Sequence, residues 1–363
     1  MSGYDVQKQH HEEFRPLECD GHHPIIAAID LGTNSCRLLV ARVNVAGVRT
    51  NYFRSRPKPV SWKVIDSFAK VVRLGEGLHS NGELSEDAMD RAMEALSVCR
   101  KKLDRYHLHS LRVVATEACR RASNNHVLVD RAKKELDFDI EIINAEEEAS
   151  LALKGCSAML NPHIPYGIVF DIGGGSTEVI LVKLKKSSKR QPGYAVPFDE
   201  IDSISVPYGV VTTTEAVGMP LETEESHKFL QGKIFERLGG FVERNNIKKL
   251  IEKEELQITG SSGTVTTLAA LHLGLEHYDR RVIDGMSILY SDLYNVISRI
   301  LKMTREERLD QSNIGFSRAD YVLTGSNILK AICDALPLKT MKIADRGVRE
   351  GILIDLMLEV IKV

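Results

Sequence analysis

The sequence lacks the features that would indicate a membrane-spanning, secreted or nucleic-acid-binding protein. No apolar run approaches the roughly 18 to 20 residues that span a bilayer, and residues 1–24 hold no apolar segment of the kind found in secretory signals. Lys and Arg number 48 against 50 Asp and Glu, so the overall charge gives no general attraction to DNA, RNA or a membrane. We therefore expect a cytoplasmic protein with neither a nucleic acid nor a membrane as partner.

Paired cysteines and the short signatures of common enzyme classes are absent too. The six cysteines form no CxxC pair, which argues against a disulfide framework and against a zinc site. No Walker A, HExxH or GxSxG pattern occurs. The chain of 363 residues is nevertheless long enough for two domains with buried cores. Its function has to be sought in a pattern spread along the chain.

A strand-turn-strand pattern occurs twice. Residues 26–40, IAAIDLGTNSCRLLV, recur as residues 167–181, GIVFDIGGGSTEVIL, with Asp30 aligned to Asp171. Each copy predicts an apolar strand, a turn of aspartate, glycine and small polar residues, and a second apolar strand. A repeat at this distance indicates two similar domains, and two unrelated hairpins are the alternative.

The rest of the chain alternates between helical and strand-like periodicity, which predicts an α/β protein. Helices are expected at residues 85–106, 127–136, 146–153, 221–245 and 347–361, and strands at 111–115 and 140–143. Residues 183–202 are expected to form an exposed loop. Its basic run is either a solvated hairpin tip or a surface that guides a polyanion, and it comprises Lys183, Lys185, Lys186, Lys189 and Arg190.

Both repeated turns have the composition of a phosphate-binding loop. Glycine leaves backbone N–H groups open to a phosphate oxygen, and hydroxyl and amide side chains add donors. Two such loops facing each other would hold a phosphate chain from both sides. The candidate residues are Gly32, Thr33, Asn34 and Ser35 in the first turn and Gly173, Gly174, Gly175, Ser176 and Thr177 in the second.

Acidic residues beside these turns are candidate metal ligands. Asp30, Asp171 and Glu178 could supply the oxygen ligands that Mg²⁺ prefers, in addition to phosphate oxygens and water. The alternative is that each aspartate only caps its own turn. Because both aspartates end an apolar strand, where a buried charge needs a partner, we favour the metal site.

Two later turns could also bind an anion. Residues 259–264, with Gly260 and Gly263, precede a helix start, where the helix dipole favours anions. Arg349 lies in a second glycine-containing segment. For each, an ordinary turn or helix start with exposed charges is an equally good interpretation.

An arginine and an acidic triplet complete the candidates. Arg120 follows a predicted strand and could hold a phosphate in a bidentate contact, or lie on a solvated helix face. Glu146, Glu147 and Glu148 begin a predicted helix, where they either complement the helix dipole or supply a general base. Spacing alone does not choose among the three.

Taken in order, these motifs resemble the exopolyphosphatase/guanosine-pentaphosphatase family, within the actin-like, sugar-kinase and heat-shock-chaperone ATPase superfamily. The matching segments are AIDLGTNS (28–35), VRLGEGL (72–78), ATEACR (115–120), EEA (147–149), FDIGGGSTE (170–178), TGSSGT (259–264) and RGVREG (346–351). The resemblance implies an α/β fold of two ribonuclease-H-like domains with the active site in the cleft between them. The first domain would comprise residues 25–148 and a helix at about 347–363 that crosses back to it, the second residues 149–346, with residues 1–24 as a flexible leader.

The resemblance also implies roles for single residues. Glu148 matches the catalytic glutamate that positions or deprotonates the attacking water, and Arg120 matches a phosphate-binding arginine. Asp171 and Glu178 match acidic residues near the metal and the water, which gives Glu178 a catalytic role as well. The two glycine turns match the family's phosphate loops.

The implied reaction is hydrolysis of a terminal phosphoanhydride of inorganic polyphosphate or guanosine pentaphosphate. Mg²⁺ is the implied cofactor, K⁺ is a candidate activator, and the family suggests a homodimer. The Arg349 motif lies close to the end of the sequence, as in short family members, so processive action on long polyphosphate is not implied. Two other functions stay open: a non-catalytic sensor of an alarmone nucleotide or polyphosphate, and a phosphotransferase that uses ATP.

Overall fold

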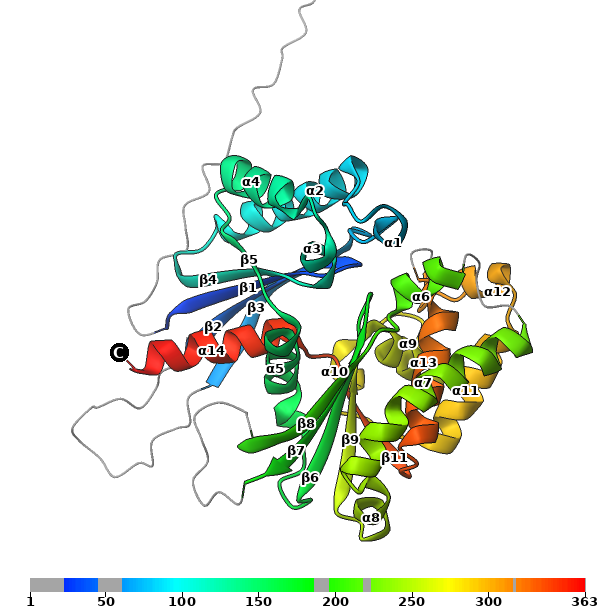
Figure 1. Ribbon diagram of the computed structural model, residues 1–363. Coiled ribbons are helices and arrows are strands. Elements are labelled where there is room, and N and C mark those ends of the chain that lie inside the picture. Colours follow the sequence, from blue (N-terminus) through cyan, green and yellow to red (C-terminus); the bar gives the residue numbers. More distant parts are fainter. Residues whose placement is uncertain (1–22, 45–60, 186–195, 218–222, 316–317, 363) are drawn as a thin grey trace, which may run out of the picture.

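A computed structural model describes residues 23–44, 61–185, 196–217, 223–315 and 318–362. Its first sheet has the strand order β3-β2-β1-β4-β5 (Figure 1). The central strand β1 (Ile25–Leu31) pairs antiparallel with β2 (Ser35–Asn44) and parallel with β4 (Leu108–Ala115). The edges are β3 (Ser61–Val71) and β5 (Ile140–Ile142).

The second sheet repeats this arrangement and adds one strand, in the order β10-β11-β9-β6-β7-β8. Its central strand β6 (Tyr166–Ile172) pairs antiparallel with β7 (Thr177–Leu184) and parallel with β9 (Leu256–Ser261). The remaining strands are β8 (Phe198–Val206), β10 (Ser287–Leu289) and β11 (Thr340–Ala344). The two predicted strand-turn-strand copies are therefore the β1–β2 and β6–β7 hairpins, and the predicted fold of two ribonuclease-H-like sheets is confirmed.

Helices cover both faces of the first sheet, as expected for strands that are almost continuously apolar. One face packs against α2 (Glu86–Leu103) and α4 (Asn125–Leu136), with the short α1 (Leu78–Asn81) and α3 (Glu117–Arg121) nearby. The helix α2 begins after Ser85, whose side chain accepts a hydrogen bond from the N–H of Ala88. The opposite face packs against α14 (Val348–Lys362).

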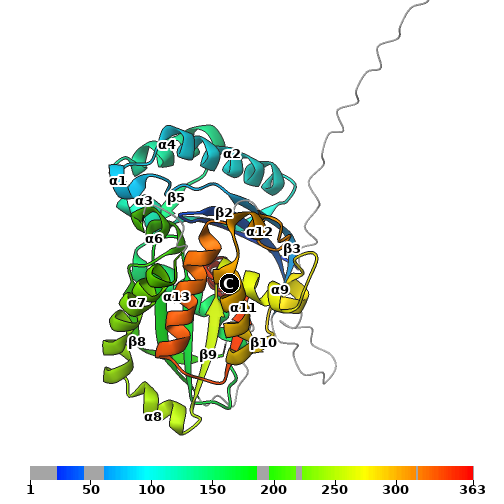
Figure 2. The same cartoon turned by 90° about the vertical axis from the view of Figure 1, so that its right-hand side faces the viewer.

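One face of the second sheet carries the larger core. It packs against α7 (Glu224–Arg244), α9 (Gly263–His272), α11 (Tyr290–Lys302) and α13 (Tyr321–Ala335), which lie side by side in Figure 2. Shorter helices connect these elements: α6 (Val210–Val217), α8 (Ile247–Glu252), α10 (Arg280–Ile283), α12 (Arg305–Leu309) and a 3₁₀ turn at Ser157–Met159.

The helix α5 (Ala145–Cys156) lies between the two sheets. Its residues Leu151 and Ala152 pack with the first sheet, and Leu153 packs with the second. Its backbone lies close to that of α14, since a Cβ on Gly351 of α14 would collide with the carbonyl of Leu151. A 2.9 Å ion pair between Lys154 and Asp355 also joins the two helices. These contacts fix the position of α5 between the two sheets.

Most predicted elements agree with the structure, and the main difference lies in residues 183–202. There β7 continues to Leu184 and β8 begins at Phe198, so the segment is partly sheet rather than all loop. Residues 186–195, which include Lys186, Lys189 and Arg190, fall outside the described residues, as do residues 1–22.

The absences inferred from the sequence can be compared with the described part of the chain. There Cys36, Cys99, Cys119, Cys156 and Cys333 are buried free thiols. None of the described helices combines the length and apolarity needed to cross a membrane. The boundaries of the two domains stay a prediction.

Candidate active site

Each of the two hairpin turns is closed by an equivalent backbone hydrogen bond, and the two turns contact each other. The N–H of Gly32 donates to the carbonyl of Ser35 at 2.9 Å, and that of Gly173 donates to the carbonyl of Ser176 at 2.9 Å. A Cβ on Gly174 would lie 2.8 Å from the Cβ of Thr33, so only glycine permits this approach. The two predicted phosphate loops therefore face each other.

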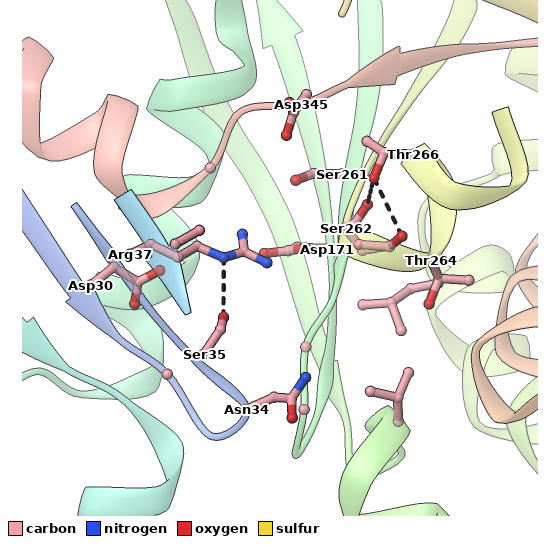
Figure 3. Close-up of a pocket in the computed structure, with 18 of the residues that line it drawn as sticks. Asp30, Asn34, Ser35, Arg37, Asp171, Ser261, Ser262, Thr264, Thr266 and Asp345 are labelled. Atoms are coloured by element: carbon pink, nitrogen blue, oxygen red, sulfur yellow. Dashed lines mark hydrogen bonds between the residues drawn. The ribbon is translucent and has the colours of Figure 1, made fainter. Parts of the chain in front are cut away.

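A cavity of about 610 Å³ lies beside these loops and is lined from both sheets (Figure 3). Its size is that of a small-molecule site. The structure brings together here most of the predicted residues, namely Asp30, Gly32, Thr33, Asn34, Ser35, Glu148, Asp171, Gly173, Gly174, Gly175, Ser176, Gly263 and Arg349. The predicted residues outside its lining are Arg120, Thr177, Glu178 and Gly260.

Thr177 and Gly260, two of the predicted residues outside the cavity lining, contact other parts of the fold instead. The Thr177 hydroxyl is buried and donates to the carbonyl of Tyr208 at 2.7 Å. Gly260 lies inside β9 rather than in a turn, and a Cβ there would lie 2.6 Å from the Phe170 ring and 2.9 Å from Met341 Sδ. The expectation that Gly260 belongs to a phosphate-binding turn is therefore wrong, because this glycine makes room for core side chains.

The two aspartates lie at equivalent positions but carry different neighbours. Asp30 pairs across the strands with Arg37, and Asp171 pairs across the strands with Glu178. Burial raises the pKa of Asp30, and the positive charges of Arg37 and Arg349 oppose that rise. Burial, with a further contribution from Glu178, raises the pKa of Asp171 to about 8.

The structure separates the three consecutive glutamates. Glu146 is exposed, and Glu147 forms a 2.6 Å ion pair with Arg112. Glu148 lines the cavity and accepts a 2.7 Å bond from Arg120, whose guanidinium also donates to the carbonyl of Ile143 at 2.9 Å. Burial raises the pKa of Glu148 to about 7 although Arg120 opposes the shift. A carboxyl with this pKa can exchange a proton near neutral pH.

Glu178 lies behind the second loop. Its carboxylate accepts hydrogen bonds from the hydroxyls of Ser176 and Ser205. Burial raises its pKa, and these two hydrogen bonds counteract part of the rise. Glu178 therefore adds negative charge next to Asp171 without lining the cavity.

Several charged residues that the sequence analysis did not assign to the site also line the cavity. They are Arg37, Lys70, Glu117, Arg280, Arg318, Asp345 and Arg346. Arg37 donates to the hydroxyl of Ser35 at 3.0 Å and points toward Asp171 in Figure 3. It could have been found from the hairpin register, which places it opposite Asp30. Arg280 and Arg318 come from α10 and from the segment before α13, where no local motif marks them.

Glu117 links the two loops. Its carboxylate accepts a 3.3 Å hydrogen bond from the Thr33 hydroxyl and forms a 3.3 Å ion pair with Arg121. Its carboxylate occupies the space that a Cβ on Gly175 would need. The third predicted turn also reaches the cavity, because Ser262, the N-cap of α9, and Gly263, its first residue, both line it.

The acidic residues suit a magnesium ion that is also bound to substrate. Among the described residues no cluster of three or more His, Cys, Asp or Glu side chains has the arrangement of a metal site. Mg²⁺ commonly uses only one or two carboxylates together with water and phosphate oxygens. Asp30 and Asp171 face the cavity, and burial is the main cause of the raised pKa of each, so ionising either carboxyl in this site is costly without a cation. A bound cation would lower that cost.

Comparisons with known proteins agree with this geometry. The model of the Ppx/GppA phosphatase family matches residues 55–360. The chain is 28% identical to the guanosine-5′-triphosphate,3′-diphosphate pyrophosphatase of Photobacterium profundum, over 92% of the chain and only 59% of that protein. It is 26% identical to exopolyphosphatase 2 of Mycobacterium tuberculosis, over 91% of the chain and 98% of that protein.

A solved structure extends the similarity to the fold. The crystal structure of the Aquifex aeolicus member of the same family superposes with a TM-score of 0.67 at 25% identity. The match covers 93% of the chain and 98% of the Aquifex protein, and therefore includes both sheets.

Proposed function

Because the chain belongs to the Ppx/GppA phosphatase family, we propose that it hydrolyses the terminal phosphoanhydride of inorganic polyphosphate, of guanosine pentaphosphate, or of both. Curated relatives are named for these two activities. The observation that carries the proposal is the position of Glu148, a carboxyl with a raised pKa that faces the two phosphate loops.

The loops and the arginines supply binding and charge. The N–H groups of Gly174 to Ser176 and of Thr33 to Ser35 hold the oxygens of the terminal phosphate. Arg37 and Arg349 offset the charge of the chain behind it, where each charge-assisted hydrogen bond contributes about 1.5–3 kcal/mol. Phosphoryl transfer needs mainly such positioning and charge stabilisation.

Glu148 orients the attacking water and takes its proton. Arg120, which also donates to the carbonyl of Ile143, pairs with one oxygen of the Glu148 carboxylate at the start of α5, so that the carboxylate keeps a defined direction. Mg²⁺, held by Asp30 and Asp171 in this proposal, would neutralise charge on the phosphate oxygens. Glu178 places a second carboxyl beside Asp171 and contributes to the raised pKa of Asp171.

The test is the release of orthophosphate in the presence of Mg²⁺. Three substrates are each assayed with the wild type, Glu148→Gln and the matched control Glu146→Gln. They are long-chain polyphosphate, guanosine pentaphosphate and ATP. We expect Glu148→Gln to lower the rate on at least one of the first two substrates by about 10²–10⁴-fold, because it removes the proton acceptor. Glu146 is exposed, so Glu146→Gln should leave the rate unchanged.

Three results would change the proposal. Equal rates for Glu148→Gln and the wild type would remove this carboxylate from the mechanism. A stoichiometric phosphorylated acceptor formed from ATP would indicate a phosphotransferase. Tight binding without release from any substrate would indicate a sensor.

A further inference from the structure

The segment that joins β3 to α1, residues 72–77, belongs to a motif to which the proposed reaction assigns no role. None of its residues lines the active-site cavity. Val72 and Leu74 are fully buried in the core between the first sheet and α2. Arg73 between them has a φ of +48°, a left-handed conformation that residues with a Cβ rarely adopt. Such backbone strain persists where the surroundings enforce it, and it is typical of functional sites.

The backbone of the 72–77 segment holds the first phosphate loop. Two N–H groups of the segment donate to the carbonyl of Asn34, at 2.9 and 3.1 Å, and that of Gly75 donates to the carbonyl of Thr33 at 2.9 Å. In a planar trans peptide the N–H points away from the carbonyl of the same peptide group. The two held carbonyls therefore set the directions of the N–H groups of Asn34 and Ser35, which bind phosphate in the proposed function.

Arg91 of α2 holds the segment in this conformation. Its Nε donates to the carbonyl of Val72 at 2.8 Å, and its Nη2 donates to the carbonyl of Arg73 at 3.2 Å. The same Nη2 lies 2.6 Å from a carboxylate oxygen of Glu76. A planar guanidinium reaches all three acceptors at once, whereas the compact ammonium of a lysine has no such fork of donors. Arg91 therefore stabilises the strained backbone at Arg73.

A residue from the side of the second sheet binds the other end of the segment. The N–H of Gly77 donates at 3.1 Å to Glu215 of α6 (Figure 1). The N–H groups that begin α6 donate, at 3.0 and 2.8 Å, to the carbonyls of Gly173 and Gly174 in the second phosphate loop. The helix α6 therefore contacts the second loop directly and the first loop through the 72–77 segment.

We infer that the 72–77 segment sets the position of the first phosphate loop relative to the second, and that Arg91 and Glu215 are positioning residues that act through it. The inference rests on the proposed function, in which the N–H groups of both loops bind the same terminal phosphate. Phosphoryl transfer depends mainly on such positioning. Neither Arg91 nor Glu215 lines the active-site cavity, so each acts on the reaction through the loop.

Arg131 of α4 provides a matched control for Arg91. Its side chain is 32% exposed, against 34% for that of Arg91. Each of the two arginines pairs with a carboxylate, and the partner of Arg131 is Asp90, at 2.8 Å, which lies outside the 72–77 segment. Replacing either arginine with methionine keeps the long stem and removes every donor, so the two variants differ in the backbone that they release.

The activity test compares Arg91→Met, Arg91→Lys and Arg131→Met on whichever substrate the wild type hydrolyses. We expect Arg91→Met to lower kcat by about 10- to 100-fold, because a small misplacement of the loop has an effect of this size. Arg91→Lys should recover part of the loss, and Arg131→Met should leave kcat unchanged. The Tm of each variant is measured as well. An Arg91→Met protein that loses Tm but keeps the wild-type kcat, or equal losses of kcat in Arg91→Met and Arg131→Met, overturns the inference.

A double variant tests whether Arg91 and Glu215 act through the same segment. Glu215→Ala should lower kcat by about tenfold, and Glu215→Gln, which keeps an acceptor oxygen for Gly77, should restore most of it. With Arg91→Met and Glu215→Ala together, the loss should be smaller than the product of the two single losses, because the first substitution already releases the segment. A loss equal to that product, or no loss in Glu215→Ala, overturns the inference.

A binding test separates this inference from the proposed function. The affinity for tripolyphosphate is measured by calorimetry with Arg91→Met and Arg131→Met, each in the Glu148→Gln background, where turnover is slow. If the wild type releases orthophosphate from no substrate, the proposed function fails, and binding alone decides the inference. Weaker binding in the Arg91→Met protein but not in the Arg131→Met protein then supports it, and equal binding in the two overturns it.

Discussion

The β1–β2 and β6–β7 hairpins pair their strands in the same register but place different charges at the same position. In the first, Asp30 faces Arg37, and in the second, Asp171 faces Glu178. Arg37 and Arg349 limit the rise in the pKa of Asp30, whereas burial and Glu178 raise the pKa of Asp171 to about 8 although Arg37 opposes that rise too. The first hairpin thus brings a cation to the cavity, and the second concentrates negative charge.

This difference shows that a repeated fold does not imply repeated chemistry. Both turns keep the same backbone hydrogen bond, so both can present N–H groups to phosphate. One cross-strand position, 37 or 178, then decides whether a hairpin favours an anion or a cation. A phosphate chain with a bound metal ion needs one of each.

The most severe way to break this asymmetry is Glu178→Arg, which gives the second hairpin the charge pattern of the first. We expect orthophosphate release to fall by about 10³-fold or more, because a cation would replace acidic charge beside the reacting phosphate. Glu178→Gln, which removes the charge and keeps the shape, should fall between this variant and the wild type. Circular dichroism checks folding, and a folded Glu178→Arg protein with near-normal rates would contradict our assignment.

Removing the cation from the first hairpin should have a smaller effect. We expect Arg37→Gln to lower kcat/KM by about 10- to 100-fold, which corresponds to one charge-assisted hydrogen bond to phosphate. Arg37→Lys keeps the charge without the planar guanidinium and should recover part of the loss. If both variants match the wild type in steady-state assays, Arg37 does not contact substrate.

The smallest effect should appear in the thermal stability of the protein, measured in the absence of divalent cations. Burial favours the neutral form of Asp171, so its pKa in the folded protein, about 8, exceeds the value of about 4 in the unfolded chain. The stabilisation that the neutral Asp171 carboxyl gives the folded protein is complete below the pKa of Asp171 in the unfolded chain. It is lost as the pH rises through the pKa of Asp171 in the folded protein. Relative to Asp171→Asn, which cannot ionise, the wild type should therefore lose a few degrees of Tm between about pH 5 and about pH 8.

The equivalent substitution in the first hairpin is the control for this prediction. Asp30→Asn should change the pH dependence less, because Arg37 and Arg349 offset the effect of burial on Asp30. Scanning calorimetry over the same pH range measures all three proteins. The same dependence of Tm on pH in all three proteins would contradict the raised pKa of Asp171.

The sequence was most informative where the structure is local. The two hairpins and the start of α2 at Ser85 follow from apolar periodicity and a capping side chain, which act over a few residues. Spacing could not choose among the three glutamates. Their environments differ through Arg112 and Arg120, which come from other elements.

Residues whose role depends on distant partners escaped prediction. Arg280 and Arg318 reach the cavity only because α10 and the segment before α13 fold against the same loops. The prediction that Gly260 lies in a phosphate-binding turn failed for a related reason. A glycine needed for close packing looks the same in a sequence as a glycine needed for a turn. Its neighbours Phe170 and Met341 lie on other strands.

The position of α14 has a consequence for protein synthesis. Buried residues of the first sheet such as Ile26 and Leu39 pack against Ile352 and Leu353 of α14, which follow the whole second sheet in the chain. A ribosome therefore makes the first sheet early, but one apolar face stays uncovered until residues 348–357 emerge. Chains stalled before that point would expose this face, which makes nascent chains of this length natural clients for chaperones and proteases.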